Sequence, residues 1–139
     1  LFGGVGLFAL PLARRYGRVV LVEGDRLAVR YARKNARLAK LTNVEAEAQA
    51  IETWIGRGLP DDADRVIVDP PRDGLDFLVR RLLVARPPRR LTYVSCHPAA
   101  LGRDLRELAA AFDVESIALA DLFPQTGHME TVAQLVRRG

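Results

Sequence analysis

The chain has 139 residues, of which 49% are hydrophobic and 27% are charged, which is enough apolar material for one domain with a sizeable core. Its single cysteine excludes an internal disulfide, and two histidines are too few to build a metal centre. The formal net charge of +4 permits a polyanionic partner such as RNA, and the cysteine usage predicts a reducing, cytoplasmic location.

The start of the chain predicts neither a membrane span nor a secretory signal. The stretch LFGGVGLFALPLARR lacks a basic n-region, and no run approaches the roughly 20 apolar residues that cross a bilayer. The glycine run GGVG should follow a strand, although only Leu1 and Phe2 precede it. We therefore expect a fragment whose first, central strand is largely missing and which is marginally stable alone.

Short β-branched runs alternate along the chain with stretches of helical spacing. Strands are predicted at 18–23, 43–48, 64–69, 90–95, 113–120 and 130–137. Helices are predicted near 6–16, 26–40, 50–57, 75–85 and 98–112. This alternation predicts an α/β fold with parallel strands joined by right-handed crossovers.

The last two predicted strands depart from that rule. Only DLFPQTGHM separates them, which leaves no room for a crossover helix, so they are expected to pair antiparallel. A mostly parallel sheet with an antiparallel last strand is the Rossmann-like fold of class I methyltransferases. A plain dinucleotide-binding fold would keep its last strand parallel.

The first candidate site consists of the glycine run and the end of the predicted strand 18–23. Gly4, Gly6 and Ala9 spell G-x-G-x-x-A, and Glu23 ends the strand that follows. Glycines let the backbone approach a cofactor, and a carboxylate in this place accepts hydrogen bonds from ribose hydroxyls. The pattern serves NAD and S-adenosylmethionine alike, and its alternatives are a structural turn and a solvated Glu23 beside Asp25.

A second candidate site follows the strand 64–69. The stretch VIVDPPRDGL places Asp69 at the carboxyl edge of the sheet, where open α/β folds bind ligands. Two prolines stiffen the backbone after it, so that Asp69 and Arg72 suit a planar base or the polar end of a cofactor. The alternative is a rigid turn in which Asp69 caps a helix.

The only cysteine lies in YVSCHPAALGRDL, where a strand gives way to a helix. Pro98 suits the first helical position, so Cys96 lies just before the amino end of that helix. The positive potential of the helix end, aided by His97, is expected to favour the thiolate form of Cys96. A small buried structural cysteine is the alternative.

The loop FPQTGHME gathers Phe123, Gln125, His128 and Glu130 near the same sheet edge. A carboxylate opposite a thiolate makes a base and a nucleophile. For His128, a satisfied loop histidine and a catalytic histidine both remain open.

These segments together resemble the S-adenosylmethionine-dependent RNA (uracil-5-)-methyltransferases. The stretches that carry the resemblance are LFGGVGLFAL, VEGDRLAVRYARKNA, DPPRDGL, YVSCHPAALGRDL and DLFPQTGHMETV, and they cover nearly the whole chain. The resemblance implies that Cys96 attacks C6 of a uridine, that C5 then takes the cofactor's methyl group, and that Glu130 removes the C5 proton. It also implies cofactor contacts at Phe2, Leu7, Glu23 and Asp69, with Gly4 and Gly6 shaping the loop.

Some features depart from the family pattern. The acid or amide that usually meets the adenine falls on Ala50, beside Gln49. The upstream RNA-binding region, often a small β-barrel, and the iron–sulfur cluster of some members are not in this sequence. Residues 1–139 are therefore expected to be the C-terminal catalytic portion, which is inactive alone if it needs the upstream part.

The leading prediction is methylation of uridine C5 in RNA, with 23S ribosomal RNA ahead of transfer RNA, by a protein with no metal in this chain and no membrane partner. An NAD-dependent oxidoreductase is supported by G-x-G-x-x-A and Glu23, but it gives Cys96 and Glu130 no role. A non-catalytic RNA-binding or assembly module is the third alternative.

Overall fold

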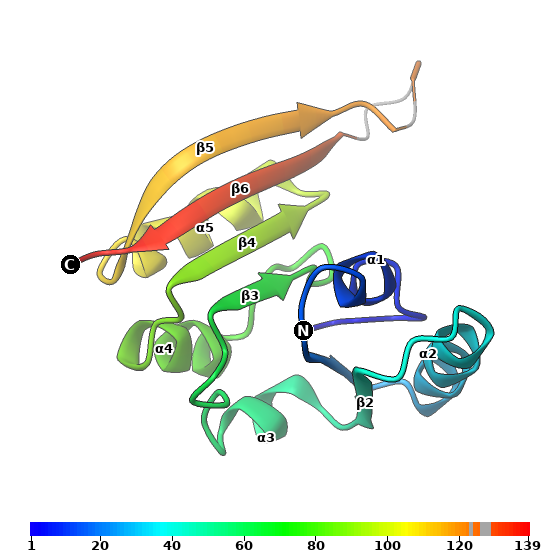
Figure 1. Cartoon of the computed structure of the whole chain (residues 1–139). Coiled ribbons are helices and arrows are strands. Elements are labelled where there is room, and N and C mark those ends of the chain that lie inside the picture. The colour runs from blue at the N-terminus through cyan, green and yellow to red at the C-terminus, as the bar shows by residue number, and fades with distance from the viewer. Residues whose placement is uncertain (123, 126–128) are drawn as a thin grey trace. The chain divides into compact units, whose positions relative to one another are not determined.

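The computed structural model describes residues 1–122, 124–125 and 129–139 and shows an α/β architecture (Figure 1). The helices are α1 (Ala9–Ala13), α2 (Arg26–Leu38), α3 (Ile51–Ile55), α4 (Phe77–Ala85) and α5 (Pro98–Leu108). The strands are β1 (Val19–Glu23), β2 (Val44–Ala48), β3 (Arg65–Val68), β4 (Arg90–Ser95), β5 (Phe112–Ala120) and β6 (Glu130–Arg137). Every predicted strand is present, with bounds within one residue of the prediction.

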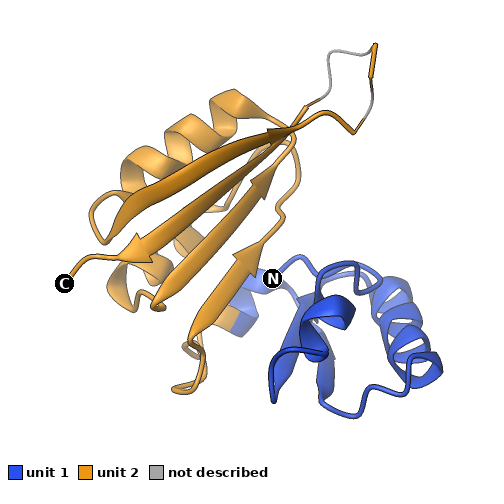
Figure 2. Cartoon of the chain, turned by 45° about the horizontal axis from the view of Figure 1, so that its top comes forward, with its two compact units in different colours: residues 1–54 blue, residues 55–139 orange. Residues whose placement is uncertain are grey.

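Two compact units make up the chain, residues 1–54 and residues 55–139 (Figure 2). In the first unit, β1 and β2 pair in parallel, with Val19 opposite Val44 and Glu23 opposite Ala48. In the second unit, four strands form one sheet in the order β3-β4-β6-β5. Each unit thus builds its own sheet from strands that the sequence predicts.

The four-stranded sheet changes direction at β6. β3 and β4 are parallel, whereas β6 runs antiparallel to both β4 and β5. Helix α4 connects β3 to β4, and helix α5 connects β4 to β5, as crossovers between parallel strands require. Residues 121–129 alone connect β5 to β6. The predicted parallel sheet with an antiparallel last strand is therefore confirmed.

All five helices are shorter than predicted, and α1 and α5 differ most from the prediction. α1 begins at Ala9 and not at residue 6, because Gly4 and Gly6 adopt φ values of +51° and +100°, which a right-handed helix does not accommodate. α5 ends at Leu108, since residues 109–111 form a turn that leads directly into β5.

Burial in the second unit follows the order of the strands. β4 lies between two neighbours, and its residues from Leu91 to Ser95 are all buried, whereas the edge strand β5 is exposed over most of its length. β6 alternates, with Thr131, Ala133 and Leu135 buried. The ends of β4 and β6 therefore extend from a buried interior.

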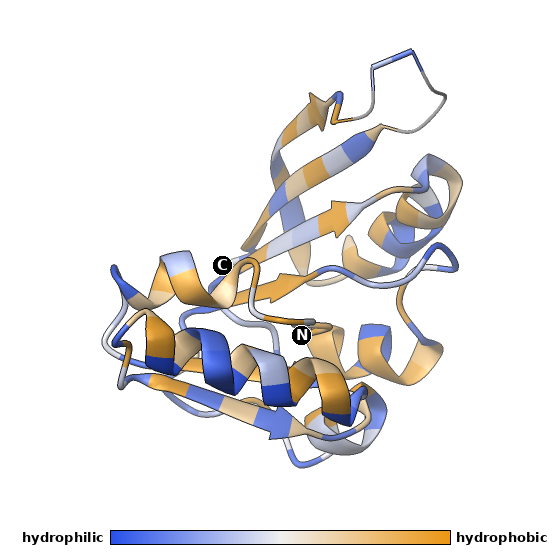
Figure 3. Cartoon of the chain, turned by 90° about the vertical axis from the view of Figure 1, so that its right-hand side faces the viewer, coloured by the Kyte–Doolittle hydropathy of each residue, from blue (hydrophilic) through white to orange (hydrophobic). Residues whose placement is uncertain are grey.

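In the first unit, one face of α2 covers β1. The residues Leu21 and Val22 of β1 and Val29 and Ala32 of α2 are buried. Figure 3 shows the resulting alternation of hydrophilic and hydrophobic bands along α2, the helix that faces the viewer. Among the described residues, no helix is both long enough and apolar enough to cross a membrane.

Candidate functional site

The loop that precedes α1 turns back on the end of β1. Phe2, Gly4 and Gly6 all have left-handed backbone, with φ values of +57°, +51° and +100°. The Gly3 amide donates to the Val22 carbonyl at 3.0 Å, and the Gly6 amide donates to the Gly3 carbonyl at 3.0 Å. This curled backbone leaves an open, side-chain-poor surface, since a Cβ on Gly4 would meet no atom within 4 Å.

Gly3 is a site residue that the sequence pattern did not single out. A Cβ built on Gly3 would lie 2.4 Å from Cγ of Leu21 and 2.9 Å from its Cδ2. A side chain at position 3 would collide with Leu21, so the close approach of the loop to β1 requires glycine there. The doubled glycine was the signal that could have found it, but the G-x-G spacing drew attention to Gly4 and Gly6 alone.

Glu23 is held by two backbone amides. Its Oε2 accepts from the Gly4 amide at 3.0 Å, and its Oε1 accepts from the Asp25 amide at 2.9 Å. A carboxylate has about four acceptor positions, so both oxygens keep capacity for further donors such as hydroxyls. Asp25 itself caps α2 through the Leu27 amide at 2.7 Å. The structure thus brings Glu23 and the glycine loop together, whereas Leu7 is 72% exposed.

In the second unit, Asp69, Cys96 and Glu130 lie at one edge of the sheet. Asp69 directly follows β3, Cys96 directly follows β4, and Glu130 begins β6. Ser95 lies opposite Thr131 in the ladder between β4 and β6, so Cys96 and Glu130 are the next residues beyond that pair. Because β4 lies between β3 and β6, the cysteine is flanked by a carboxylate on either side.

Asp69 is affected both by burial and by the nearby Glu130. Burial raises the pKa of Asp69, and the negative charge of Glu130 raises it further. A raised carboxyl pKa means that the folded protein holds the proton more tightly than the unfolded chain does. The ionised form of Asp69 therefore destabilises the fold at neutral pH, and this penalty disappears as the pH falls below the ordinary carboxyl pKa of 3.8. A residue that costs stability where a ligand can bind is typical of a functional site.

Asp69→Asn is accordingly expected to stabilise the protein at pH 7. The rise in Tm should be small, on the order of 2 °C, and it should vanish at a pH where the wild-type carboxyl is protonated. Thermal melts at several pH values measure it, with the exposed Asp61→Asn as the matched control that leaves Tm unchanged. A Tm that falls at pH 7 in Asp69→Asn would contradict this assignment.

The turn that holds Cys96 is fixed by its two neighbours. His97 is the N-cap of α5, and its Nδ1 accepts from the Ala100 amide at 3.3 Å. Ser95 Oγ accepts from the His97 amide at 3.1 Å and donates to the His97 carbonyl at 3.2 Å. Cys96 is a half-buried free thiol between them, close to the helix amino end. The structure shows His97 as the N-cap of α5, and its influence on Cys96 stays a prediction.

Loss of this cap is expected to be measurable. His97→Ala should lower the free energy of unfolding by about 1 kcal/mol, because the Ala100 amide then has no side-chain acceptor. His97→Asn is the matched variant, since asparagine is a preferred N-cap and should retain most of that stability. Urea denaturation compares the two, and equal stability of the alanine and asparagine variants would show that the cap contributes nothing.

Part of the predicted site lies outside the described residues. Phe123 and His128 belong to that part, so a satisfied loop histidine and a catalytic histidine both remain alternatives for His128. Gln125 is described and has a φ of +69°. Within the described ranges, no group of three or more histidine, cysteine, aspartate or glutamate side chains is arranged to hold a metal ion.

Comparison with known proteins adds a family relationship. A family model described as tRNA (Uracil-5-)-methyltransferase matches residues 61–138. A 23S rRNA (uracil(1939)-C(5))-methyltransferase from Klebsiella pneumoniae is 39% identical over 145 residues, which cover 99% of this chain and 32% of that protein. Its counterpart from Alkalilimnicola ehrlichii is 41% identical, with coverage of 99% and 32%. The chain thus spans about a third of the length of the curated relatives it matches.

Solved structures share the fold. The Pyrococcus abyssi tRNA (uracil-54, C5)-methyltransferase in complex with S-adenosyl-L-homocysteine superposes with a TM-score of 0.85 and 34% identity, over 97% of this chain and 33% of that one. An rRNA methylase from Streptococcus thermophilus has a TM-score of 0.75 and 13% identity, with coverage of 98% and 82%, and supports the fold alone. The predicted class I methyltransferase fold is confirmed by this likeness.

Proposed function

Because the chain belongs to the tRNA (uracil-5-)-methyltransferase family, we propose that it carries the catalytic site for methylation of uridine C5 in RNA. The observation that supports this most directly is the position of Cys96 and Glu130 beyond the paired Ser95 and Thr131, at the ends of adjacent strands. A nucleophile and a base on neighbouring strands can act on adjacent atoms of one flat ring.

We assign S-adenosylmethionine as the cofactor, held by the glycine loop and Glu23. The Glu23 carboxylate is already oriented by the Gly4 and Asp25 amides and keeps acceptor capacity for ribose hydroxyls. Phe2, Leu7 and Asp69 are the other proposed contacts. The bound cofactor supplies a methyl group on a positively charged sulfur, which makes that carbon an electrophile.

Uracil C5 is too weak a nucleophile to take a methyl group directly, and Cys96 is proposed to activate it. When the Cys96 thiolate bonds to C6, the C5=C6 electron pair moves into an enolate, and C5 becomes nucleophilic. After C5 has gained the methyl group, the Glu130 carboxylate removes the C5 proton. The freed electron pair restores C5=C6 and expels the Cys96 thiolate, and the residues return to their starting state once Glu130 has lost its proton to water.

We propose 23S ribosomal RNA as the preferred substrate. The support is the identity of 39% and 41% to two proteins named for uracil(1939) of 23S rRNA, against 34% to the structure named for tRNA. Incubation of the complete gene product with labelled S-adenosylmethionine and either RNA, followed by nucleoside mass spectrometry, is the test. We expect 5-methyluridine in the ribosomal RNA, and labelling of transfer RNA alone would reverse the substrate assignment.

The oxidoreductase alternative is separated by ligand binding. S-adenosylhomocysteine should bind to the complete gene product and protect it against thermal unfolding, whereas NADH should do neither. The opposite pattern would contradict the proposed function.

A further inference from the structure

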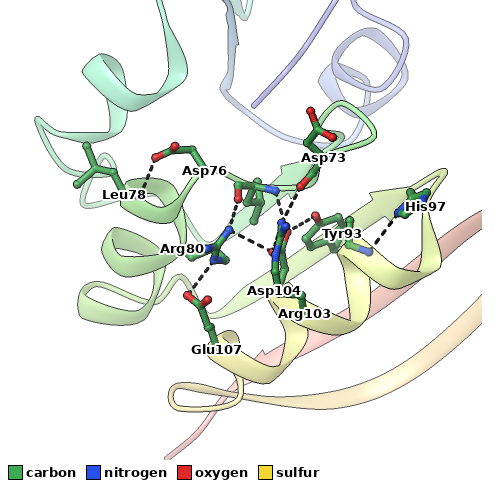
Figure 4. A network of polar contacts seen from close by, with 11 residues as sticks. Asp73, Asp76, Leu78, Arg80, Tyr93, His97, Arg103, Asp104 and Glu107 are labelled. Atoms are coloured by element: carbon green, nitrogen blue, oxygen red, sulfur yellow. Dashed lines mark hydrogen bonds and ion pairs between the residues drawn. The ribbon is translucent and has the colours of Figure 1, made fainter.

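A fully buried carboxylate lies inside the second unit, on the inner face of α5 (Figure 4). Asp104 is 0% exposed, and four partners donate to it. Its Oδ2 accepts from the Leu75 amide at 2.7 Å and from Tyr93 Oη at 2.6 Å. Its Oδ1 accepts from Arg103 Nη2 at 2.7 Å and from Arg80 Nη1 at 3.2 Å.

The charges in this cluster compensate one another. Two guanidinium groups face Asp104, and the buried Arg80 also donates from Nε to Glu107 at 2.8 Å and from Nη1 to the Leu75 carbonyl. Burial, and then the hydrogen bond to Asp104, raise the pKa of Tyr93, so the phenol remains a donor at physiological pH. Every acceptor position of the carboxylate is therefore used within the protein.

The loop after β3 packs directly against the Asp104 carboxylate. Gly74 has a φ of +80°, and a Cβ added to it would lie 2.5 Å from Asp104 Oδ2 and 2.7 Å from Arg103 Nη2. Arg103 Nη2 also donates to the Asp73 carbonyl at 2.6 Å. Both the backbone conformation and the space thus require glycine at position 74.

The cluster connects the three segments that flank the proposed catalytic cysteine. The clamped loop begins at Asp69, Tyr93 lies in β4 three residues before Cys96, and Asp104 lies in the helix that follows it. An apolar cluster could stabilise this interior equally well, but it would not fix the backbone of the loop in one place. Directional hydrogen bonds to a loop backbone do fix it.

We propose that Asp104 is a positioning residue, which sets where the segment from Asp69 to Arg72 stands relative to Cys96. This inference rests on the proposed function. Displacement of a reacting or binding group by about 1 Å can cost on the order of a hundredfold in rate. Asp104 touches neither substrate nor cofactor and acts through the loop.

Two substitutions test this from opposite sides of the same contact. Asp104→Asn keeps the side-chain volume but removes the charge that the two arginines face. Gly74→Ala keeps the carboxylate but pushes the loop away from it. In the complete gene product, each is expected to lower the single-turnover rate of methyl transfer at saturating RNA and cofactor by at least about tenfold. The double variant should be little worse than either one, because both act on one contact.

Hydrogen exchange at the Leu75 amide separates positioning from general stability. We expect exchange to become at least about tenfold faster in Asp104→Asn, with the amides of β4 unchanged. Asp76→Ala is the control from the same loop: it removes the cap that accepts from the Leu78 amide at 2.7 Å, and it should leave the methyl-transfer rate within about twofold. If Asp104→Asn does not fold, Arg103→Ala should give a severalfold loss, because it removes the bonds of the half-exposed Arg103 to Asp104 and to the Asp73 carbonyl.

The outcomes can be told apart. Faster Leu75 exchange with an undiminished methyl-transfer rate would overturn the positioning role, and so would unchanged Leu75 exchange. Absence of methyl transfer by the unmodified protein would contradict the proposed function instead, and Leu75 exchange would then decide whether Asp104 clamps the loop.

Discussion

Cys96→Ala is expected to abolish methyl transfer to uridine C5. The single-turnover rate of the complete gene product should fall on the order of a thousandfold or more, because C5 cannot be activated without a nucleophile at C6. Within residues 1–139, no second cysteine could take over this role. Mass spectrometry of 5-methyluridine after incubation with RNA and S-adenosylmethionine measures the loss.

The binding of both substrates is the control for this variant. Cys96 is half-buried and follows a strand held by buried neighbours, so loss of one sulfur should leave the fold intact. Affinities for RNA and S-adenosylhomocysteine should stay within about threefold, since the lost interaction is made only during the reaction. Undiminished methylation by Cys96→Ala would rule out the covalent mechanism.

Glu130→Gln is expected to stop the reaction at a later stage. An amide cannot take the C5 proton, so release of the product should slow by about a hundredfold to ten-thousandfold. Because the addition of Cys96 and the methylation precede that step, RNA should accumulate as a methylated covalent adduct that survives denaturation. A denaturing gel with labelled, unmodified RNA detects it.

The matched control is Glu115→Gln, which removes an exposed carboxylate of β5 that pairs with Arg90 at 2.6 Å. This variant should turn over normally and trap no RNA. Glu130→Gln should in addition lower the pKa of Asp69 towards its ordinary value, because the negative charge that adds to the effect of burial is gone. Normal product release by Glu130→Gln would show that Glu130 is not the base that removes the C5 proton.

The strands themselves and the antiparallel pairing of the last one could be predicted from the sequence. Strand and helix periodicities differ enough to place β4 and β6 correctly, and the short connection before β6 dictates the antiparallel pairing. Strand ends then bring Asp69, Cys96 and Glu130 to one edge, although they are far apart in the chain. Topology, and not local sequence, determines which strand ends become neighbours.

Close approaches could not be predicted in the same way. Gly3 and Gly74 are required by atoms of Leu21 and Asp104, which lie far along the chain and give no periodic signal. The sequence does contain a signal for Asp104, because this acidic residue lies on the same buried face of α5 as Leu101 and Leu108. A charge on the apolar face of a helix indicates a buried partner but does not identify it.

The most direct test of the covalent mechanism is a trapping experiment with RNA that carries 5-fluorouridine at the target position. Fluorine replaces the C5 proton that Glu130 is proposed to remove, so Cys96 cannot be expelled after methylation. We predict a denaturation-resistant complex of the complete gene product with this RNA, formed only with S-adenosylmethionine present, and a cross-linked peptide that contains Cys96. A complex that forms equally well with Cys96→Ala, or methylation of normal RNA with no trapped complex, would contradict the mechanism.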